Sequence, residues 1–204
     1  MPITIQVSSA GNIWFYGDKE CAQNHKCNFT IRTSADNFIA FQLYILIPEG
    51  VEIIQVEKGK DIREWAFSYN VLEEYYEINE NVYDKRLEII GIGKEKPLAG
   101  TKEIALITFK PRISKNLTFI IDRESTKFVD PNEKEIKINR FYNHSVRVYR
   151  YGDVNMDNEV DVKDLIRLER IILTEEKQTI TSDLNDDGSV NILDLVKLIN
   201  LLVE

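Results

Sequence analysis

A twelve-residue segment that occurs twice near the end of the chain constrains the fold more than any other feature of the sequence. Residues 153–164 (DVNMDNEVDVKD) align without gaps on residues 183–194 (DLNDDGSVNILD), at an offset of thirty residues. In each copy, apolar residues with helical spacing follow the segment. The sequence therefore predicts two related units, each a loop that leads into a short helix, over residues 153–173 and 183–203.

Both segments carry oxygen atoms at the positions from which an EF-hand-type loop binds calcium. Calcium takes roughly six to eight oxygen ligands, and such a loop supplies them from positions 1, 3, 5, 7, 9 and 12, with position 7 acting through its backbone carbonyl. The sequence therefore predicts two bound Ca2+ ions. The predicted ligands are Asp153, Asn155, Asp157, Glu159, Asp161 and Asp164 in the first loop, and Asp183, Asn185, Asp187, Ser189, Asn191 and Asp194 in the second.

Position 6 of such a loop needs a positive φ angle, which glycine adopts freely and asparagine tolerates better than other residues. Gly188 fills this position in the second loop and Asn158 in the first. Two features depart from the ordinary EF-hand: position 12 is Asp instead of Glu, and no amphipathic helix precedes either loop.

The formal net charge of −8 at pH 7 comes from the last quarter of the chain. Residues 152–204 hold 13 of the 34 acidic side chains but only 5 of the 26 basic ones, whereas the rest of the chain is balanced. Such a segment repels itself unless cations neutralise it, which favours bound metal. No basic stripe is present for binding phosphates, so nucleic-acid binding is not expected. No apolar run is long enough to span a membrane.

Residues 1–150 have a different periodicity, because apolar and polar residues alternate between polar turns. The pattern predicts a mainly β N-terminal domain over 1–150, an antiparallel β-sandwich of the jelly-roll type, and a small all-α C-terminal domain over 151–204. The clearest predicted strands span residues 3–7, 29–31, 39–47, 51–56, 65–71, 87–92, 104–109, 117–121 and 145–149.

The two cysteines, Cys21 and Cys27, enclose five residues that include His25. A disulfide in an oxidising compartment and a pair of free thiols are both compatible with this spacing. A Cys/His/Cys metal site is the third interpretation, but the sequence offers no fourth ligand nearby.

Each predicted helix carries more apolar residues than one buried face needs. We expect the core face to consist of Val162, Leu165, Ile166, Ile172 and Leu173 in one helix, and of Ile192, Leu195, Val196, Ile199 and Leu202 in the other. The surplus pairs at equivalent positions, Leu168 with Leu198 and Ile171 with Leu201, then form a surface for a protein partner. The alternative is that these four residues pack against the connector or the β domain.

The duplicated segment, with its Asp-x-Asn-x-Asp openings and Asp at position 12, resembles a dockerin over about residues 152–204. The resemblance implies that calcium is needed for folding and that the two helices bind a cohesin domain in extracellular polysaccharide-degrading complexes such as cellulosomes. It also places partner choice at loop positions 10 and 11, which are Val162, Lys163, Ile192 and Leu193. Many dockerins carry Ser-Thr there, so a different specificity is expected.

The β domain is similar to a cohesin in the order of several segments: 41–48, 51–59, 67–71, 103–110 and 128–136. It departs from the family in two places, because Leu46-Ile47 replaces the usual Tyr-Asp before Pro48 and the cysteine loop is unfamiliar. By this resemblance one sheet of the sandwich is the docking face, and Gln42 and Tyr44 on a central strand are its predicted contact residues.

These resemblances predict a non-catalytic adaptor that is exported, with any leader removed, and that binds dockerin- or cohesin-bearing proteins or further copies of itself. The alternative is a carbohydrate-binding sandwich joined to a dockerin, with polysaccharide stacked on Trp14, Trp65, Tyr75 and Tyr76, the last two expected in an acidic loop. Catalytic residues are not expected, because His25 and His144 lack the context of a triad.

Overall fold

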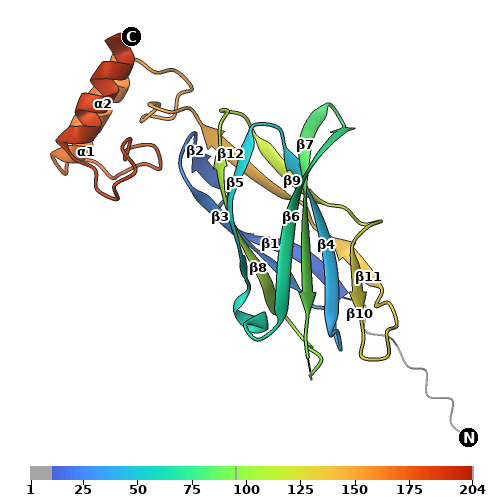
Figure 1. The fold of residues 1–204 in the computed structure, drawn as a ribbon. Helices are drawn as coiled ribbons and strands as arrows, with labels where there is room; N and C mark the ends of the chain where they lie inside the picture. Colours follow the sequence, from blue (N-terminus) through green and yellow to red (C-terminus); the bar gives the residue numbers. More distant parts are fainter. Residues whose placement is uncertain (1–10, 95, 204) are drawn as a thin grey trace, which may run out of the picture.

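The computed structural model describes residues 11–94 and 96–203. Figure 1 shows a β-sandwich with a pair of helices beyond one of its ends. The strand expected over residues 3–7 lies outside the described residues. Within them, no helix is both long enough and apolar enough to cross a bilayer.

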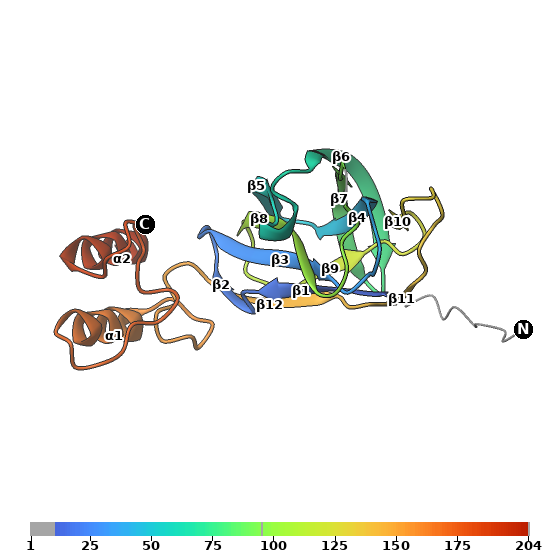
Figure 2. The same cartoon turned by 90° about the horizontal axis from the view of Figure 1, so that it is seen from below.

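Two sheets face each other in the sandwich, as Figure 2 shows from below. One has five strands in the order β11-β1-β3-β8-β5. Their bounds are β1 (Gly11–Gly17), β3 (Cys27–Thr33), β5 (Val51–Lys58), β8 (Lys102–Pro111) and β11 (Ile138–Phe141). A 3-10 turn, η1 (Lys60–Ile62), follows β5.

The other sheet has seven strands, with the order β2-β12-β9-β4-β7-β6 and β10 paired to β4. Their bounds are β2 (Glu20–Ala22), β4 (Ala40–Pro48), β6 (Ala66–Ile78), β7 (Asn81–Ile92), β9 (Leu117–Ile121), β10 (Lys127–Val129) and β12 (His144–Tyr149). In the described residues, β1 pairs with β11 and β2 with β12 in parallel, and the remaining pairs are antiparallel. The predicted mainly β sandwich is confirmed.

Alternation along each strand builds the sandwich core. In β4, Phe41, Leu43, Ile45 and Ile47 point inward and are fully buried or nearly so, because successive side chains of a strand point to opposite faces of the sheet. Equivalent residues of the five-stranded sheet meet them to form a single apolar cluster rich in phenylalanine.

Several segments differ from the sequence expectation. The short strands β2, β10 and β11 were not expected, nor was β1, in which only Ile13 and Phe15 of the seven residues carry the inward apolar pattern. Tyr75 and Tyr76 lie on the long edge strand β6 and not in an acidic loop. The end of β6 extends past the core with both faces partly open to solvent, so glutamates interrupt its alternation and hide the strand.

The last quarter of the chain contains two helices, α1 (Val162–Ile172) and α2 (Ile192–Val203), each preceded by one of the duplicated loops. They have a small apolar cluster of their own, in which Val154, Leu168, Ile171, Leu184 and Leu198 are buried. Two loop-helix units around a second cluster agree with the predicted helical part of the fold.

Candidate metal-binding loops and docking faces

The carboxylate at position 1 shapes the beginning of each loop. Asp153 accepts hydrogen bonds from the backbone N–H of Asp157 (3.0 Å) and of Asn158 (3.0 Å). Asp183 accepts the equivalent pair from Asp187 (3.3 Å) and Gly188 (2.8 Å). The backbone of each loop therefore folds around its position-1 carboxylate in the same way, as the repeat predicts.

The carboxylate at position 12 closes each loop from the first turn of the following helix. In the first loop Asp164 Oδ1 accepts from the N–H of Asn155 (2.9 Å) and Oδ2 from the N–H of Asp161 (2.8 Å). Asp161 also caps α1 by accepting from Lys163 N–H, which completes a capping box with Asp164. These contacts bring positions 3, 9 and 12 of the first loop together.

The second loop closes in the same manner. Asp194 Oδ1 accepts from the N–H of Leu184 (2.8 Å) and of Asn185 (3.1 Å), and Oδ2 accepts from the N–H of Asn191 (2.8 Å). The shorter Asp at position 12 reaches the loop because the helix begins directly beside it.

Positions 3, 5 and 7 repeat as well. The position-3 amides donate to the position-5 carboxylates, Asn155 to Asp157 at 2.9 Å and Asn185 to Asp187 at 2.7 Å. The backbone N–H at position 7 donates to the same carboxylates, from Glu159 (3.0 Å) and from Ser189 (2.9 Å). All twelve predicted ligands thus occupy equivalent places in the two loops.

The backbone turns where the sequence requires it, and at one further position. Asn158 and Gly188 at position 6 have φ angles of 71° and 86°. Met156 and Asp186 at position 4 also have positive φ, 64° and 61°. Position 4 carries no glycine in either copy, so this second turn could not be predicted from the residue types.

The electrostatics of the loops fit a hard cation. Asp153, Asp164 and Asp194 are fully buried, and within residues 11–94 and 96–203 none of them forms an ion pair. Burial raises the pKa of Asp153, and the negative charge of Asp164 adds to this rise although backbone hydrogen bonds oppose it. Carboxylate oxygens have further lone pairs beyond those that accept the N–H groups. A divalent ion would supply the missing positive charge.

Acidic side chains alone do not complete either site. In the described part of the chain, no three Asp, Glu, His or Cys side chains are placed to hold a metal by themselves. A calcium ion at either loop would therefore also need the asparagine amide oxygens and the position-7 carbonyl oxygens, which is a mixed oxygen set that calcium accepts.

Lys163 distinguishes the first loop from the second. Its ammonium group lies 3.1 Å from Asp161, 3.5 Å from Asp157 and 3.6 Å from Glu159. These carboxylates raise the pKa of Lys163 above its ordinary value. The equivalent residue in the second loop is Leu193, so only the first loop carries its own exposed cation at position 11.

The inward face of the two helices differs from our expectation. Leu168 and Leu198 are 0% exposed and Ile171 is 4% exposed, so they form the core, and Leu201 packs partly buried against them. The reason lies in position 12: Asp164, Leu168 and Ile171 share one helical face by their spacing. Because Asp164 must face the loop, this whole face turns inward.

Six of the ten residues expected to form the helical core are instead exposed, whereas Leu165, Ile172, Leu195 and Leu202 pack partly buried against the core as expected. Val162 and Ile192 are 63% and 59% exposed, and Ile166 and Val196, one turn further along, are also exposed. Six exposed apolar side chains of the two helices make up what we call the helical face: Val162, Ile166, Ile192, Leu193, Val196 and Ile199. Ile192 and Val196 repeat Val162 and Ile166 at the offset of thirty residues.

On the sandwich, Gln42 and Tyr44 belong to a polar network on the outer side of β4 and β7. Gln42 Nε2 donates to Glu88 (2.7 Å), and the Tyr44 hydroxyl donates to the same carboxylate oxygen (2.6 Å). These two hydrogen bonds lower the pKa of Glu88. Both predicted residues are thus partly exposed and fixed in position.

Arg86 joins this network to the neighbouring strands. Its guanidinium lies over the Tyr44 ring, 4.5 Å from the centroid, and pairs with Glu74 of β6 (3.1 Å) and with Asp122 (3.5 Å). The outer side chains of β4, β6 and β7 around Arg86 form what we call the sheet face. Its charged side chains are held in place by these contacts across three adjacent strands.

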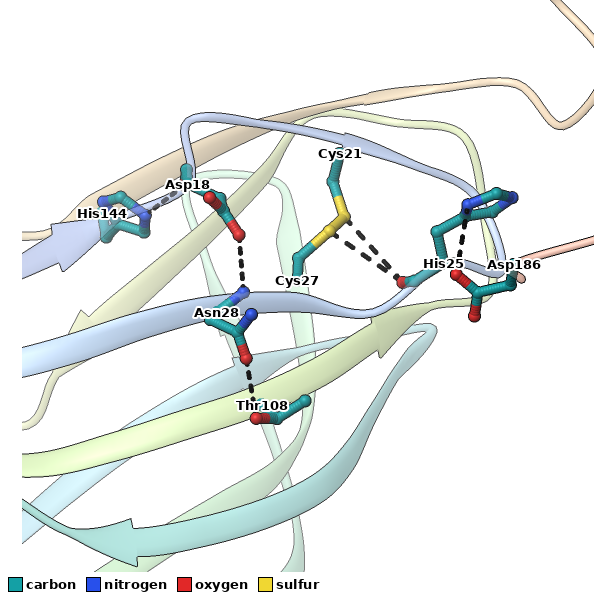
Figure 3. Close-up of a disulfide and its surroundings, with 8 residues drawn as sticks. All are labelled: Asp18, Cys21, His25, Cys27, Asn28, Thr108, His144 and Asp186. Carbon is teal, nitrogen blue, oxygen red and sulfur yellow. Dashed lines mark hydrogen bonds and ion pairs between the residues drawn. A yellow bond between two sulfur atoms is a disulfide. The ribbon is translucent and has the colours of Figure 1, made fainter. Parts of the chain in front are cut away.

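A disulfide joins Cys21 and Cys27, whose Cα atoms are 6.2 Å apart (Figure 3). The cysteines are therefore not metal ligands together with His25. The His25 ring points away from the sulfur atoms toward the second loop, where its Nδ1 lies 3.8 Å from Asp186 Oδ1. His144 is buried elsewhere, with Nε2 2.7 Å from the backbone oxygen of Asp18.

Gly152 connects strand β12 to the first loop at a point where only glycine fits. Its φ is +90°, and an added Cβ would lie 2.5 Å from Leu201 Cδ2 and 3.1 Å from Val160 Cγ1. We expect Gly152→Ala to destabilise the helical part by about 1–3 kcal/mol, because both the backbone and the contact are strained. Thermal unfolding followed by circular dichroism in calcium measures this.

Gly100→Ala is the matched control for that substitution. Gly100 also has a positive φ, +72°, but nothing lies within 4 Å of an added Cβ. An equal loss of stability in both variants would contradict the steric part of the argument.

The described part of the chain is thus a β-sandwich followed by two loop-helix units with oxygen-rich loops. Comparisons with known proteins specify the modules. Residues 151–203 match the dockerin type I domain. A comparison with curated proteins found no significant match.

Solved structures that resemble the sandwich are cohesin modules. The non-cellulosomal cohesin of the archaeon Archaeoglobus fulgidus has a TM-score of 0.54 and 16% identity, over 69% of this chain and 91% of that one. A cohesin module from a family 33 glycoside hydrolase of Clostridium perfringens has a TM-score of 0.53 and 9% identity, over 69% and 98%. A chain of the CaDoc0917–CaCohA2 complex has a TM-score of 0.54 and 13% identity, over 68% and 99%.

The chain therefore joins a sandwich with the cohesin fold to a C-terminal dockerin type I domain. Both expected resemblances are confirmed at this level: the fold for the sandwich, and the sequence family for residues 151–203.

Proposed function

We propose that this protein is a non-catalytic adaptor that assembles other proteins through calcium-dependent cohesin–dockerin contacts. The observation that carries the proposal is the combination in one chain of a dockerin type I domain and a sandwich with the cohesin fold. Cohesin and dockerin modules pair with each other, so this chain has both halves of such a pair. A chain of this kind links unlike proteins, or joins copies of itself into open head-to-tail chains.

The helical face is the proposed contact surface of the dockerin. It exposes six apolar side chains on two short helices, more than a unit of this size leaves open without a partner. Loop positions 10 and 11, which we expected to decide partner choice, are Val162, Lys163, Ile192 and Leu193, and all four are exposed. The absence of Ser-Thr there suits a cohesin partner with a largely apolar contact surface.

The sheet face is the proposed contact surface of the sandwich. Gln42, Tyr44, Glu88 and Arg86 are held by mutual hydrogen bonds and ion pairs, so they would lose little conformational freedom on binding. Such preorganised polar groups favour a specific partner over a non-specific one.

The setting we propose is an extracellular or cell-surface complex that degrades polysaccharides. The Cys21–Cys27 disulfide supports an oxidising compartment, and calcium is abundant enough outside cells to fill weak sites. Two calcium ions, one in each loop, are part of the same proposal.

The alternative function is a sugar-binding sandwich that uses four aromatic residues, and one of these four is not accessible to a sugar. Trp65 is buried against Phe38 and Phe41 and has no face left for a sugar ring. Tyr75 is exposed at the edge of the sandwich, and this single observation is what still favours the alternative.

A capture experiment with the full chain tests the proposal. The chain is immobilised and exposed to panels of cohesin modules and dockerin modules, with calcium and with EDTA. We expect at least one module to be captured in calcium and released by EDTA. Retention of the chain on insoluble polysaccharide, with no captured module from either panel, would instead support the sugar-binding alternative.

A further inference from the structure

We propose that the sandwich positions the second calcium loop, so that calcium affinity at residues 183–194 depends on Tyr151 and on the Cys21–Cys27 loop, whereas the first loop is supported by the helical part alone. The inference rests on the calcium binding of the proposed function and adds to it a role for the sandwich.

Tyr151 is the residue that connects the sandwich to the second loop. Its backbone N–H donates to the side-chain oxygen of Gln23 (3.3 Å), which lies between the two cysteines. Its hydroxyl donates to the backbone oxygen of Leu184 (2.9 Å), and its ring lies 6.1 Å from that of His25. Tyr151 thus contacts both the disulfide-closed segment and position 2 of the second loop.

The bond to Leu184 acts on a ligand of the predicted calcium site. The peptide unit whose oxygen accepts from Tyr151 also carries the N–H of Asn185, which donates to Asp194 Oδ1 (3.1 Å). Lys197 donates to the same Leu184 oxygen (3.1 Å). Fixing this peptide therefore favours the orientation of the carboxylate at position 12 that the folded loop requires.

The first loop has an equivalent bond with a different origin. The oxygen of Val154, also at position 2, accepts from the hydroxyl of Thr179 (3.1 Å), which belongs to the connector between the two units. Thr179 is held in turn by Ser182 at 2.7 Å. Hence the first loop is supported from within the helical part, and the second from the junction with the sandwich.

The segment that supports Tyr151 is itself firmly held. The disulfide closes residues 21–27, and both Sγ atoms lie within 4.0 Å of the His25 carbonyl oxygen. Gln23 is fixed to Tyr149 and to Arg112 by two hydrogen bonds of 2.8 Å. Figure 3 shows that the His25 ring extends from this segment to Asp186, position 4 of the second loop.

Contacts to the first loop are different in kind. An open cleft of about 380 Å³ is lined by Met156 and Asn158 of the first loop together with Lys115 and Arg147 of the sandwich. Among the described residues, the hydroxyl of Tyr151 and the ring of His25 reach the second loop, and no side-chain hydrogen bond or ion pair joins residues 11–150 to the first. Because the cost of ordering a loop is subtracted from the free energy of metal binding, contacts from the sandwich that favour the ordered loop raise affinity at the second loop and not at the first.

Calorimetric titration of the full chain with calcium tests the inference. Each loop is observed separately by inactivating the other with Asp157→Ala or Asp187→Ala. We expect Tyr151→Phe, which removes the hydroxyl and keeps the ring, to weaken the second loop by about three- to tenfold, the effect of one hydrogen bond. The double variant Cys21→Ser, Cys27→Ser is expected to weaken the same loop, and neither change should affect the first.

Thr179→Val is the matched control, because it removes the equivalent hydrogen bond at the first loop and should weaken that loop alone. Hydrogen exchange of the amides of residues 184 and 185 in the calcium-loaded chain gives a second measurement, with faster exchange expected in Tyr151→Phe. Unchanged second-loop affinity and unchanged exchange in both sandwich-side variants would overturn the inference. A wild-type chain that binds no calcium would overturn the calcium dependence of the proposed function, and this inference with it.

Discussion

Removal of calcium is expected to unfold residues 152–204 while the sandwich stays folded. Three buried carboxylates, Asp153, Asp164 and Asp194, have no ion pair within the described residues, and the segment carries 13 acidic against 5 basic side chains. Only five apolar residues are buried in its core cluster. The burial of so few apolar residues cannot offset the repulsion between the acidic side chains unless metal is bound. Calcium binding and folding of this segment should therefore be coupled.

Two signals separate the parts of the chain in this experiment. Both tryptophans, Trp14 and Trp65, lie in the sandwich, and both α-helices lie in the last quarter. We expect EDTA to abolish the helical circular dichroism and to leave the tryptophan fluorescence nearly unchanged. Excess calcium should restore the helical signal.

Substitutions identify the loops as the origin of this response. Asp157→Ala combined with Asp187→Ala should abolish it, because each removes a position-5 ligand. Glu159→Gln is the matched control, since position 7 binds through its backbone oxygen and its side chain is exposed. A helical signal indifferent to both EDTA and added calcium would reject the coupling, as would an Asp157/Asp187 variant that still responds.

The loops could be predicted from the sequence because nearly everything that shapes them lies within twelve residues. Asp153 and Asp164 reach their backbone partners across one loop, so the spacing alone implies the geometry. The twelve predicted ligands remain a prediction until metal is observed on them, but their equivalent places in the two copies agree with the repeat.

The helix faces could not be predicted from periodicity alone. Apolar residues spaced by three and four positions identify an apolar face of a helix. When a helix carries two such faces, the spacing does not say which of them points to the core. The decision comes from Asp164, whose position in the loop turns Leu168 and Ile171 toward the core. The requirement that Asp164 face the loop, considered before the apolar pattern, predicts the inward face of α1 correctly.

Contacts between distant segments could not be predicted from the sequence. The bond from Tyr151 to Leu184 and the approach of His25 to Asp186 join residues that no local pattern relates. The second half of the edge strand β6, beyond the predicted residues 65–71, was missed for a related reason: its pairing with β7 compensates for glutamates that weaken its own pattern.

Introducing one negative charge on the helical face is expected to abolish docking without unfolding the dockerin. Val196 is 48% exposed near the middle of α2 and belongs to the helical face. Val196→Asp would bury an unpaired carboxylate at the centre of a contact with a cohesin. The expected loss of affinity is roughly a hundredfold or more, measured by biosensor binding of a cohesin module that the unmodified chain captures.

The control for this variant is Gln178→Asp, which adds the same charge on the exposed connector between the two units. It should bind the cohesin as the unmodified chain does, because the connector is outside the helical face. Both variants should keep the calcium-dependent helical signal, since neither side chain belongs to the buried cluster. Normal binding by a folded Val196→Asp chain would exclude the helical face as the docking surface. The same substitution at buried Leu198 should instead abolish the helical signal itself, because that residue is fully enclosed in the core.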